Sequence, residues 1–438
     1  MEFISRTISS LIENEYKNYS RYVCYNRAIP NLIDSFKPSQ RKAFYVIPKT
    51  SDFIKVQAVS GRMISEANYN HGDASASETV TKMAQDFTGS NNIPVFEKKG
   101  SFGSKFIKKG SAPRYIYVKA NKLFYDLYND FELCPLSDDI ENPEPKYYLP
   151  IIPTILLNGV SGIAVGFATE ILPYNIFDII GNIKNFLNQT AFDEMVPFFN
   201  GFNGEVYKNS DGTKYIQCGK YEILNTNTIK VKEVPTEFDR EKYIKHLDNL
   251  VEKKIITTYD ENCKGSDWNI TIKAPRSSKI FDDVNSTLKL ESILNENITV
   301  IDEHGEIITF LNAYDLLTYF IKFRLGVYQQ RIQYMLNKIK EEVFLNRSKI
   351  KFILEMNQLD FKNLSKGKIR EHFKNLEFSD DHLNKCFDIK SYNFNIDFLK
   401  ELKNRIEELK KEWEYYKIIT PKELYLIDLN NLEKKLKW

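Results

Sequence analysis

A seam of apolar residues near the C-terminal end constrains the fold of this chain more strongly than any other feature. Its members are separated by alternating steps of four and three residues: Ile321, Leu325, Tyr328, Ile332, Met335 and Ile339. A helix with such a seam must bury it against a second helix, as coiled coils do. A second long amphipathic stretch runs from Phe398 to Tyr416. We therefore expect a long antiparallel coiled coil with a small helical cap, although an ordinary helical domain is the competing interpretation.

A chain of 438 residues suits two or three domains rather than one core. Residues 1–150 mix helical and turn-rich stretches, with a helix expected from Thr7 to Tyr25. Residues 151–310 contain short strands and one helix, expected from Asp239 to Lys254. Residues 311–438 are helical by their periodicity. The sequence therefore predicts an α+β multidomain protein.

Charge is unevenly distributed along the chain. Residues 1–122 carry 19 Lys and Arg against 10 Asp and Glu, a balance of +9. The whole chain carries +2, which leaves −7 for the remainder. A basic segment beside an acidic one indicates that a polyanion binds the first part. A solvated lysine-rich surface has the same composition, so the motifs must decide between the two interpretations.

The five cysteines lie far apart and include no C-x-x-C pair. We expect them to be reduced, with neither a disulfide framework nor a zinc site. The beginning of the chain carries acidic residues and no long apolar stretch, which argues against a signal peptide. No apolar run approaches the roughly 20 residues that a transmembrane helix needs. These features predict a soluble, cytoplasmic protein, and the absence of metal and nucleotide motifs predicts no metal site in this chain.

Four stretches in the first half of the chain carry the functional signal. They are RAIPNLIDSFKPSQRK at 27–42, NHGD at 70–73 followed by ETVTKMAQ at 78–85, GSFGS at 100–104 leading to APRY at 112–115, and LNGVSGIAVG at 157–166. In this order and at these distances they resemble the breakage-reunion subunit of type IIA DNA topoisomerases, the gyrase A and topoisomerase IV A family. In overall plan the chain resembles most the short form of that subunit in T-even-type bacteriophages.

The resemblance implies a fold and a division of labour between subunits. Residues 1–150 would form a winged-helix DNA-cleavage domain, residues 151–310 a tower domain with a DNA-bending wedge, and residues 311–438 the coiled coil with a C-terminal dimer gate. No Toprim motif, ATPase fold or DNA-wrapping domain is recognisable in the sequence. The resemblance therefore implies a large partner subunit that carries the Toprim and ATPase domains, holds Mg²⁺ and uses ATP.

Tyr115 is the residue on which the predicted chemistry depends, because it follows Arg114 and a stretch rich in glycine and lysine. A phenol that attacks a phosphodiester must lose its proton, approach in line and have the phosphoryl charge relieved. The planar guanidinium of Arg114 suits the last task, since it can hold two phosphoryl oxygens. For an isolated Arg-Tyr pair, a surface strand is the alternative. The resemblance implies that Tyr115 becomes joined to DNA, and that Arg27 and His71 also face the scissile phosphate.

Further residues are expected to hold DNA without reading its sequence. The basic side chains given this role are Lys37, Arg41, Lys42 and Lys105. Ile163, between small residues, is by default a buried strand residue, but the resemblance implies a wedge that kinks the duplex. His71 by itself would be a turn or capping residue. Two positions depart from the family pattern: Tyr69 stands where a second histidine is common, and Ala74 replaces the serine that binds quinolone drugs.

The resemblance implies the activity of an ATP-hydrolysing type II DNA topoisomerase. Two copies, paired through the C-terminal gate, would cleave both strands of a duplex, form 5′-phosphotyrosyl links and relax supercoils by strand passage. A phage-encoded protein would do this in the cytoplasm of its bacterial host. Three alternatives stay open: the A subunit of a bacterial topoisomerase IV or gyrase with a truncated C-terminus, a non-catalytic DNA-binding scaffold of the same fold, and a tyrosine recombinase. The last fits poorly with few histidines and an early tyrosine.

Overall fold

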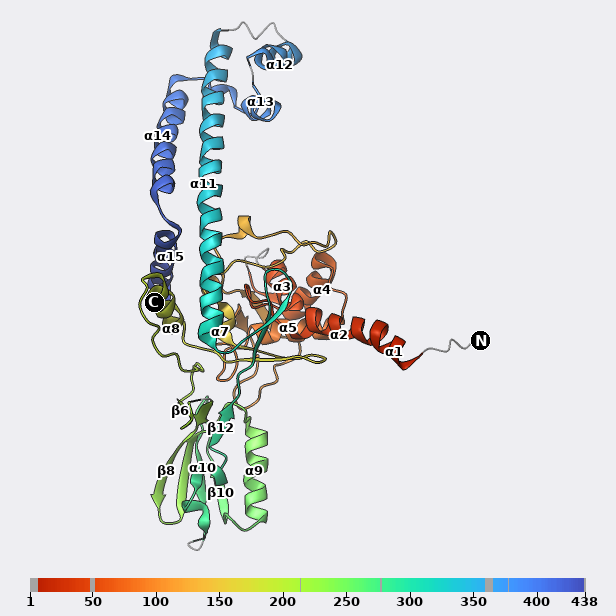
Figure 1. Ribbon diagram of the computed structural model, residues 1–438, viewed down its shortest axis with the longest axis vertical. Coiled ribbons are helices and arrows are strands. Elements are labelled where there is room, and N and C mark those ends of the chain that lie inside the picture. Colours follow the sequence, from red (N-terminus) through yellow and green to blue (C-terminus); the bar gives the residue numbers. More distant parts are fainter. Residues whose placement is uncertain are drawn as a thin grey trace, which may run out of the picture. The chain divides into compact units, whose positions relative to one another are not determined.

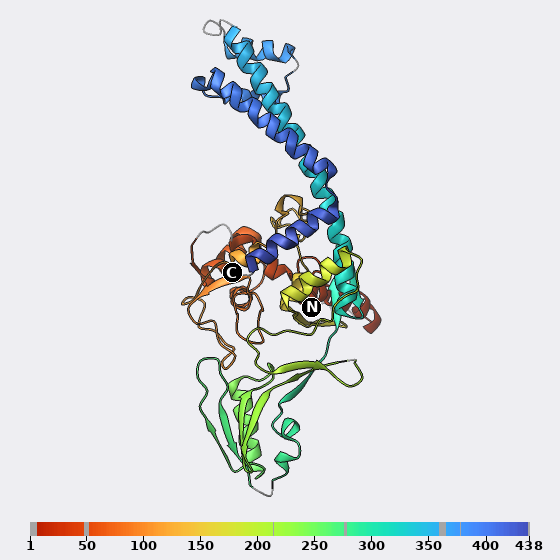
Figure 2. The ribbon, with the colours of Figure 1, turned by 90° about the vertical axis from the view of Figure 1, so that its left-hand side faces the viewer.

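The structure, a computed structural model, describes residues 7–47, 52–212, 214–275, 278–358, 365–376 and 378–436. It contains both α-helices and β-strands, and it divides into two compact units. Unit 1 comprises the chain up to Phe323 together with the stretch from Asp428, and unit 2 comprises Arg324–Ile427. Figures 1 and 2 show the elements of each unit. None of the helices in the described ranges is long and apolar enough to cross a membrane.

Unit 1 begins with a helical run in which α turns alternate with π turns. Its parts are α1 (Ile8–Leu11), η1 (Ile12–Tyr16), α2 (Lys17–Val23) and η2 (Cys24–Ala28). The run starts at Thr7, whose side-chain oxygen accepts a hydrogen bond of 3.2 Å from an amide of the first turn. It stops at Ile29, where the backbone becomes extended. The predicted helix from Thr7 to Tyr25 is confirmed and continues to Ala28.

Three helices and a small antiparallel sheet follow. They are α3 (Pro38–Val46), α4 (Val56–Ala67) and α5 (Asp73–Met83), with β1 (Ile54–Lys55), β2 (Phe96–Lys99) and β3 (Tyr117–Ala120) paired in the order β1-β3-β2. Pro38 occupies the first position of α3, where its missing N–H does no harm. Asn68 ends α4 with a positive φ of 50°. The alternating sequence YIYVKA at 115–120 predicts a strand, and β3 forms over its last four residues.

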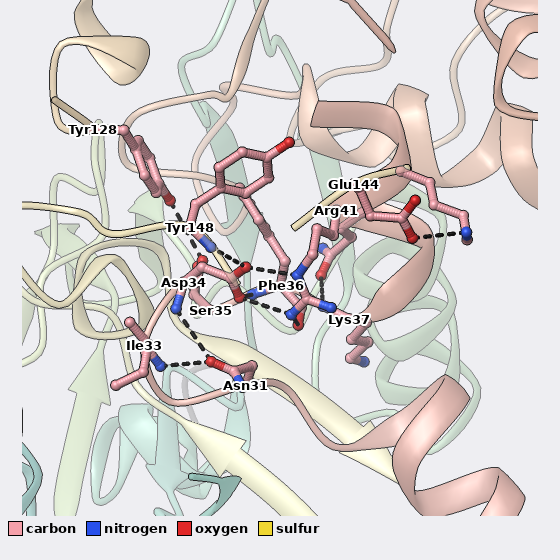
Figure 3. Close-up of polar contacts among 12 residues, drawn as sticks. Asn31, Ile33, Asp34, Ser35, Phe36, Lys37, Arg41, Tyr128, Glu144 and Tyr148 are labelled. Carbon is pink, nitrogen blue, oxygen red and sulfur yellow. Dashed lines mark hydrogen bonds and ion pairs between the residues drawn. The ribbon is translucent and has the colours of Figure 1, made fainter. Parts of the chain in front are cut away.

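A buried carboxylate organises the loop that leads into α3 (Figure 3). The oxygens of Asp34 accept hydrogen bonds from the Arg41 guanidinium at 2.7 and 3.0 Å. They also accept from the backbone amides of Phe36 and Tyr148, at 3.0 and 3.1 Å. Asp34 is fully buried and Arg41 nearly so. The ion pair and the two amides together satisfy a charge that burial alone would make costly.

The structure corrects the expectation that Arg41 and Lys42 contact DNA. The guanidinium of Arg41 is occupied by Asp34 inside the protein. Lys42 is also buried, and its ammonium lies 2.7 Å from the Glu144 carboxylate. Both cations thus neutralise internal carboxylates, so their role in this fold is structural.

The apolar run that follows residues 1–150 folds partly as a helix, and not only as the buried strands and turns that its composition predicts. Its elements are α7 (Thr154–Asn158), a hairpin of β4 (Val160–Ile163) and β5 (Ala168–Ile171), and, later in the chain, a second hairpin of β13 (Ile298–Ile301) and β14 (Ile307–Phe310). Gly159 connects α7 to β4 at a φ of 65°. A Cβ at this position would lie 2.6 Å from the carbonyl oxygen of Ile171, so the connection requires glycine.

Two small sheets and a helix form a strand-rich region of unit 1. The sheets have the orders β10-β11-β9-β8 and β12-β7-β6. The bounds are β6 (Glu205–Lys208), β7 (Tyr215–Cys218), β8 (Lys220–Asn225), β9 (Thr228–Glu233), α9 (Arg240–Glu252), β10 (Thr258–Glu261), β11 (Ile270–Lys273) and β12 (Glu291–Leu294). Tyr243 and Leu247 of α9 pack in one apolar core with Ile229 and Ile270. The short strands and the helix predicted for this segment are confirmed.

Helix α8 (Ile176–Leu187) and the C-terminal stretch complete unit 1. Lys184 of α8 forms an ion pair of 2.9 Å with Glu433, and Lys435 forms one of 2.9 Å with Asp126. Glu433 and Lys435 belong to α15 (Pro421–Leu436), which begins in unit 2. Shorter helices of unit 1 are α6 (Lys122–Tyr125), η4 (Phe131–Leu133), η5 (Lys279–Phe281) and α10 (Val284–Thr287).

Unit 2 is built from helices that carry the apolar seam. They are α11 (Ala313–Gln358) from Arg324 onward, α12 (Lys366–Asn375), α13 (Asp380–Phe387), η7 (Ser391–Asn393), α14 (Ile396–Ile418) and the start of α15. Tyr328 stacks on Tyr425 with ring centroids 4.6 Å apart, and Arg405 of α14 donates to Glu342 of α11 at 3.0 Å. These contacts show that α11 runs antiparallel to α14 and α15, as Figures 1 and 2 also show. We call these helices the helical pair.

The seam and the cap of unit 2 account for its buried side chains. Ile332 and Ile339 of α11 are buried, as is Leu409 of α14. In the chain, α12 and α13 lie between α11 and α14. They pack against the end of α11 in one apolar cluster that includes Phe352 of α11 and Phe373 of α12. A small helical cap at the far end of the helical pair is therefore present, as the sequence predicts.

Asp34→Asn should destabilise unit 1 strongly. The buried Arg41 guanidinium would lose its charged partner, and breaking a buried ion pair from one side costs about 3–5 kcal/mol. The matched control is Glu78→Gln, which breaks an exposed pair with Lys82 and should cost no more than about 1 kcal/mol. Urea denaturation followed by intrinsic fluorescence measures both. Equal unfolding midpoints for the two variants would contradict the structural role of Asp34.

Candidate nucleic-acid interface

Tyr115 lies in an exposed turn that leads into β3. A hydrogen bond of 2.9 Å from the Tyr115 amide to the Ala112 carbonyl closes the turn. The Val56 amide donates to the carbonyl of Ile116 at 3.0 Å, which fixes the residue that follows. The side chain of Tyr115 is 63% exposed. The fold therefore holds the backbone of this residue while its phenol is open to solvent.

Arg114 lies against the ring of Tyr115. Its guanidinium carbon is 4.8 Å from the ring centroid, a cation–π distance that keeps the two side chains together. Arg114 is exposed as well. A cation beside an accessible nucleophile can stabilise the negative charge that develops on a phosphoryl group. The structure thus brings together the two residues that the sequence predicts to be central.

Arg27 and His71 are brought together by Tyr22, a residue that the sequence did not single out. The Tyr22 hydroxyl lies 2.9 Å from Nε2 of His71. The guanidinium carbon of Arg27 lies 5.3 Å from the centroid of the Tyr22 ring. Tyr69 meets the imidazole edge-on, with centroids 5.2 Å apart. We call Tyr22, Arg27, Tyr69 and His71 the His71 cluster.

One hollow borders this cluster, and a second hollow adjoins the first. The first, of about 530 Å³, is lined by Arg27, Tyr69 and His71 of the cluster. The second, of about 1420 Å³, extends to the stretch 108–113 that leads to the Tyr115 turn. Both hollows are lined by the same four polar side chains: Lys37, Gln40, Glu78 and Lys82. Arg114 and Tyr115 do not line either hollow, so the phenol of Tyr115 lies outside both hollows of its own chain.

Lys37 links the hollows to the hairpin of β4 and β5. Its ammonium donates to the carbonyl of Ser161 at 2.7 Å, which leaves further N–H donors for an anion. Burial, together with repulsion from the Lys82 ammonium, lowers the pKa of Lys37. The hairpin approaches this closely because Gly162 has no side chain, and a Cβ there would lie 2.1 Å from the carbonyl oxygen of Ala28.

Ile163 stands at the tip of this hairpin. It is 90% exposed and pairs with Ala168 at the last position of the ladder. A hydrogen bond of 2.9 Å from the Ala164 amide to the Phe167 carbonyl closes the tip. Phe167 is also exposed. The structure therefore overturns the default interpretation of Ile163 as a buried strand residue and leaves its side chain accessible to a ligand.

Lys105 differs from the expectation that it binds DNA. Its ammonium is buried and lies 3.0 Å from the carboxylate of Glu233, at the end of β9. The adjacent Phe106 packs edge-on against Trp268, with ring centroids 4.8 Å apart. Lys105 therefore anchors the stretch before Tyr115 to the strand-rich region, because an ammonium buried with one carboxylate is not available to phosphate.

The site contains residues that the sequence did not single out, and the described residues include no cluster of metal ligands. Within the described ranges, no group of three or more His, Cys, Asp or Glu side chains is placed to hold a metal ion. The sequence signal for Tyr22 was only its position within a helix, since the π turns that orient it leave no mark on the sequence. The only sequence signal for Lys82 is its position four residues after Glu78. This spacing equally indicates an ordinary surface ion pair.

Comparison with known proteins gives a consistent set of relatives. A family model that describes the A subunit of DNA gyrase/topoisomerase IV matches residues 27–433. The chain is 31% identical over 453 residues to the DNA topoisomerase medium subunit of Enterobacteria phage T4, covering 99% of this chain and 100% of that one. It is 29% identical over 480 residues to DNA topoisomerase 2 of Plasmodium falciparum, covering 98% of this chain and 34% of that one.

One solved structure resembles nearly the whole chain. It is the DNA-binding, cleavage and re-ligation domain of Plasmodium falciparum topoisomerase II, with a TM-score of 0.89 and 28% identity over 97% of this chain and 64% of that one. The chain thus spans the full length of the phage subunit but about a third of the Plasmodium enzyme.

Proposed function

Because this chain belongs to the family of DNA gyrase and topoisomerase IV A subunits, it is a DNA-cleaving and resealing subunit of a type II topoisomerase, and we propose that its nucleophile is the phenolic oxygen of Tyr115. The observation that carries the assignment is the exposed phenol with the Arg114 guanidinium 4.8 Å from its ring. The chain matches the phage medium subunit over that subunit's full length. This match favours the plan of the phage subunit over that of a truncated A subunit of a bacterial gyrase or topoisomerase IV.

In the proposed reaction the phenolate oxygen of Tyr115 attacks a backbone phosphorus of DNA. A bond forms between that oxygen and phosphorus, the bond from phosphorus to the 3′ oxygen breaks, and the departing oxygen takes a proton to become a 3′-hydroxyl. The 5′ end stays on the tyrosine. One phosphodiester replaces another, so resealing is the reverse step and needs no outside energy. Two copies of the chain would cut the two strands.

Cations of this chain would stabilise the attack. Arg114 is placed to hold phosphoryl oxygens beside the attacking phenol. Arg27 and His71 line the first hollow and would face a phosphate bound there. The described residues provide no metal-ligand set, so Mg²⁺ would take its ligands from a partner subunit.

The finer architecture and the partners are part of the proposal. Helices α3, α4 and α5 with the β1-β3-β2 sheet support a winged-helix domain in residues 1–150, and the strand-rich region supports a tower within residues 151–310. The helical pair in residues 311–438 would provide the coiled coil and C-terminal gate of a homodimer. A Toprim and ATPase subunit would supply ATP-driven strand passage, relaxing double-stranded DNA in the cytoplasm of a bacterial host.

Two further residues are proposed to hold the duplex. Lys37 directs its remaining N–H donors toward the hollows and would contact a phosphate. Ile163, exposed at its hairpin tip, would insert between base pairs and bend the duplex. The hydrogen bond from Lys37 to Ser161 ties both residues to one hairpin.

Tyr115→Phe should abolish covalent protein–DNA adducts, because the attacking oxygen is removed while a ring remains for Arg114. The chain is mixed with its partner subunit, Mg²⁺ and supercoiled plasmid, and adducts are trapped with detergent. Tyr117→Phe, in β3, is the matched control and should form adducts as the unaltered chain does. If the Tyr115 variant cuts equally well, the nucleophile is another residue. If the unaltered chain binds DNA without cutting it, the scaffold interpretation holds instead.

Lys37→Ala should weaken the salt dependence of DNA binding. Each phosphate contact adds about −0.9 to the slope of log K against log salt concentration, so the slope should shrink by roughly one contact. Lys253→Ala, exposed after α9, is the control. Because the pKa of Lys37 is lowered, its charge and its contribution to affinity should disappear at a lower pH than for an ordinary lysine. Lys37→Arg should keep the affinity there, and an unchanged slope for Lys37→Ala would argue against the contact.

Ile163→Ala should reduce the bend of bound DNA while leaving the free energy of unfolding within about 0.5 kcal/mol, since the side chain is exposed. Energy transfer between dyes at the two ends of a short duplex reports the bend. Ile223→Ala, on an exposed position of β8, is the control. The same end-to-end distance with both variants would refute the wedge.

A further inference from the structure

Tyr22 contacts two of the residues expected to face the scissile phosphate. Its hydroxyl is 2.9 Å from Nε2 of His71, and its ring carries the Arg27 guanidinium at 5.3 Å. Arg27 and His71 belong to segments of the chain that are separated by α3 and α4. Tyr22 is therefore the side chain through which the two are connected in the His71 cluster.

Arg27 lies in the π turn η2, which directly follows the helix α2 that carries Tyr22. Its characteristic hydrogen bond runs from the Ile29 amide back to the Cys24 carbonyl at 3.0 Å, across five residues. Tyr22 and Arg27 are also five residues apart, a spacing that a π turn brings to one side and an α turn does not. The local backbone thus places the guanidinium over the phenol ring.

The neighbouring cation decides which group donates in the bond between Tyr22 and His71. A guanidinium against the ring draws electron density from the phenolic oxygen, which makes its O–H a better donor and a poorer acceptor. The Tyr22 hydroxyl therefore donates to Nε2. The nitrogen that keeps the ring proton of a neutral histidine is then Nδ1, because the bond made by one nitrogen fixes the state of the other.

We propose that Tyr22 is a positioning residue that holds His71 as the Nδ1–H tautomer, with this N–H available to a DNA phosphate in the first hollow. The inference rests on the proposed function of the chain. Tyr22 itself would touch neither the phosphate nor the phenol of Tyr115. It acts through His71, and its removal should change the catalytic step more than DNA binding.

A packing role for Tyr22 is the competing explanation, and its exposure argues against it. The side chain is 37% exposed, and its neighbour on the same helical run, Tyr19, is 55% exposed. Removing a hydroxyl from such a position has little effect on stability. The two tyrosines therefore form a matched pair, in which Tyr22 alone has a hydroxyl bonded to His71.

Tyr22→Phe tests the proposal, because it keeps the ring beneath Arg27 and removes only the hydroxyl. In the complex with Mg²⁺ and the partner subunit, single-turnover DNA cleavage should slow by about 10-fold, less than the 10²–10⁴ attributed to a general acid or base. DNA affinity should stay within about two-fold of the unaltered chain. Tyr19→Phe should cleave at the unaltered rate. Unaltered cleavage by Tyr22→Phe would overturn the proposal.

A double variant separates an action through His71 from an independent one. If Tyr22 works only through the imidazole, Tyr22→Phe combined with His71→Ala should cleave no more slowly than His71→Ala alone. Multiplied losses in the double variant would show that the two residues act separately, which contradicts a positioning role.

A spectroscopic readout follows the tautomer itself. The chain contains five histidines, so ¹⁵N labelling of histidine alone gives a spectrum in which His71→Gln identifies the signals of His71. The unaltered chain should show a protonated Nδ1 and an unprotonated Nε2. Tyr22→Phe should lose this pattern and Tyr19→Phe should keep it. An Nε2–H form in the unaltered chain would overturn the inference, whereas a failure of the Tyr115 assignment would show in the adduct experiment and leave this spectrum unchanged.

Discussion

The carboxylate of Asp34, buried among groups far apart in the sequence, sets the position of much of the site. It accepts from the Arg41 fork and from the amides of Phe36 and Tyr148, so the loop before α3 is bound to the segment after α6. Lys37 lies between Phe36 and Arg41 in the sequence, and its hydrogen bond to Ser161 holds it beside the β4–β5 hairpin. The position of Lys37 at the hollows thus depends on a charge that solvent does not reach.

The basic residues of the first 122 positions fall into two classes that composition cannot separate. Lys37 faces the hollows, and Arg114 is exposed beside Tyr115. Lys42 and Lys105 are buried with Glu144 and Glu233. Whether a lysine meets phosphate or an internal carboxylate depends on a partner that is far away in the chain. The sequence shows the local excess of positive charge, but it does not show the distant carboxylate that pairs with a given lysine in the fold.

Periodicity predicted the elements whose structure depends on local pattern, such as β3, α9 and the long helices of unit 2. Periodicity did not predict the exposure or the contacts of residues whose surroundings are set by tertiary structure. An isoleucine among small residues looks buried, but Ile163 stands at the tip of a hairpin and is exposed. Nothing in the sequence indicates that Tyr22 contacts His71, because the two residues are far apart in the chain and meet only in the fold. The contact between Arg114 and Tyr115 could be predicted, since the two residues are adjacent in sequence and also in space.

The buried pair of Lys105 and Glu233 has a mechanical consequence. The stretch that leads to Tyr115 cannot move away from β9 without leaving the buried Glu233 carboxylate without its cation, which costs several kcal/mol. The Tyr115 turn and the strand-rich region should therefore move as one rigid body. A DNA end joined to Tyr115, as we propose, would then be carried by the whole body rather than by a loose loop, which keeps it aligned for rejoining.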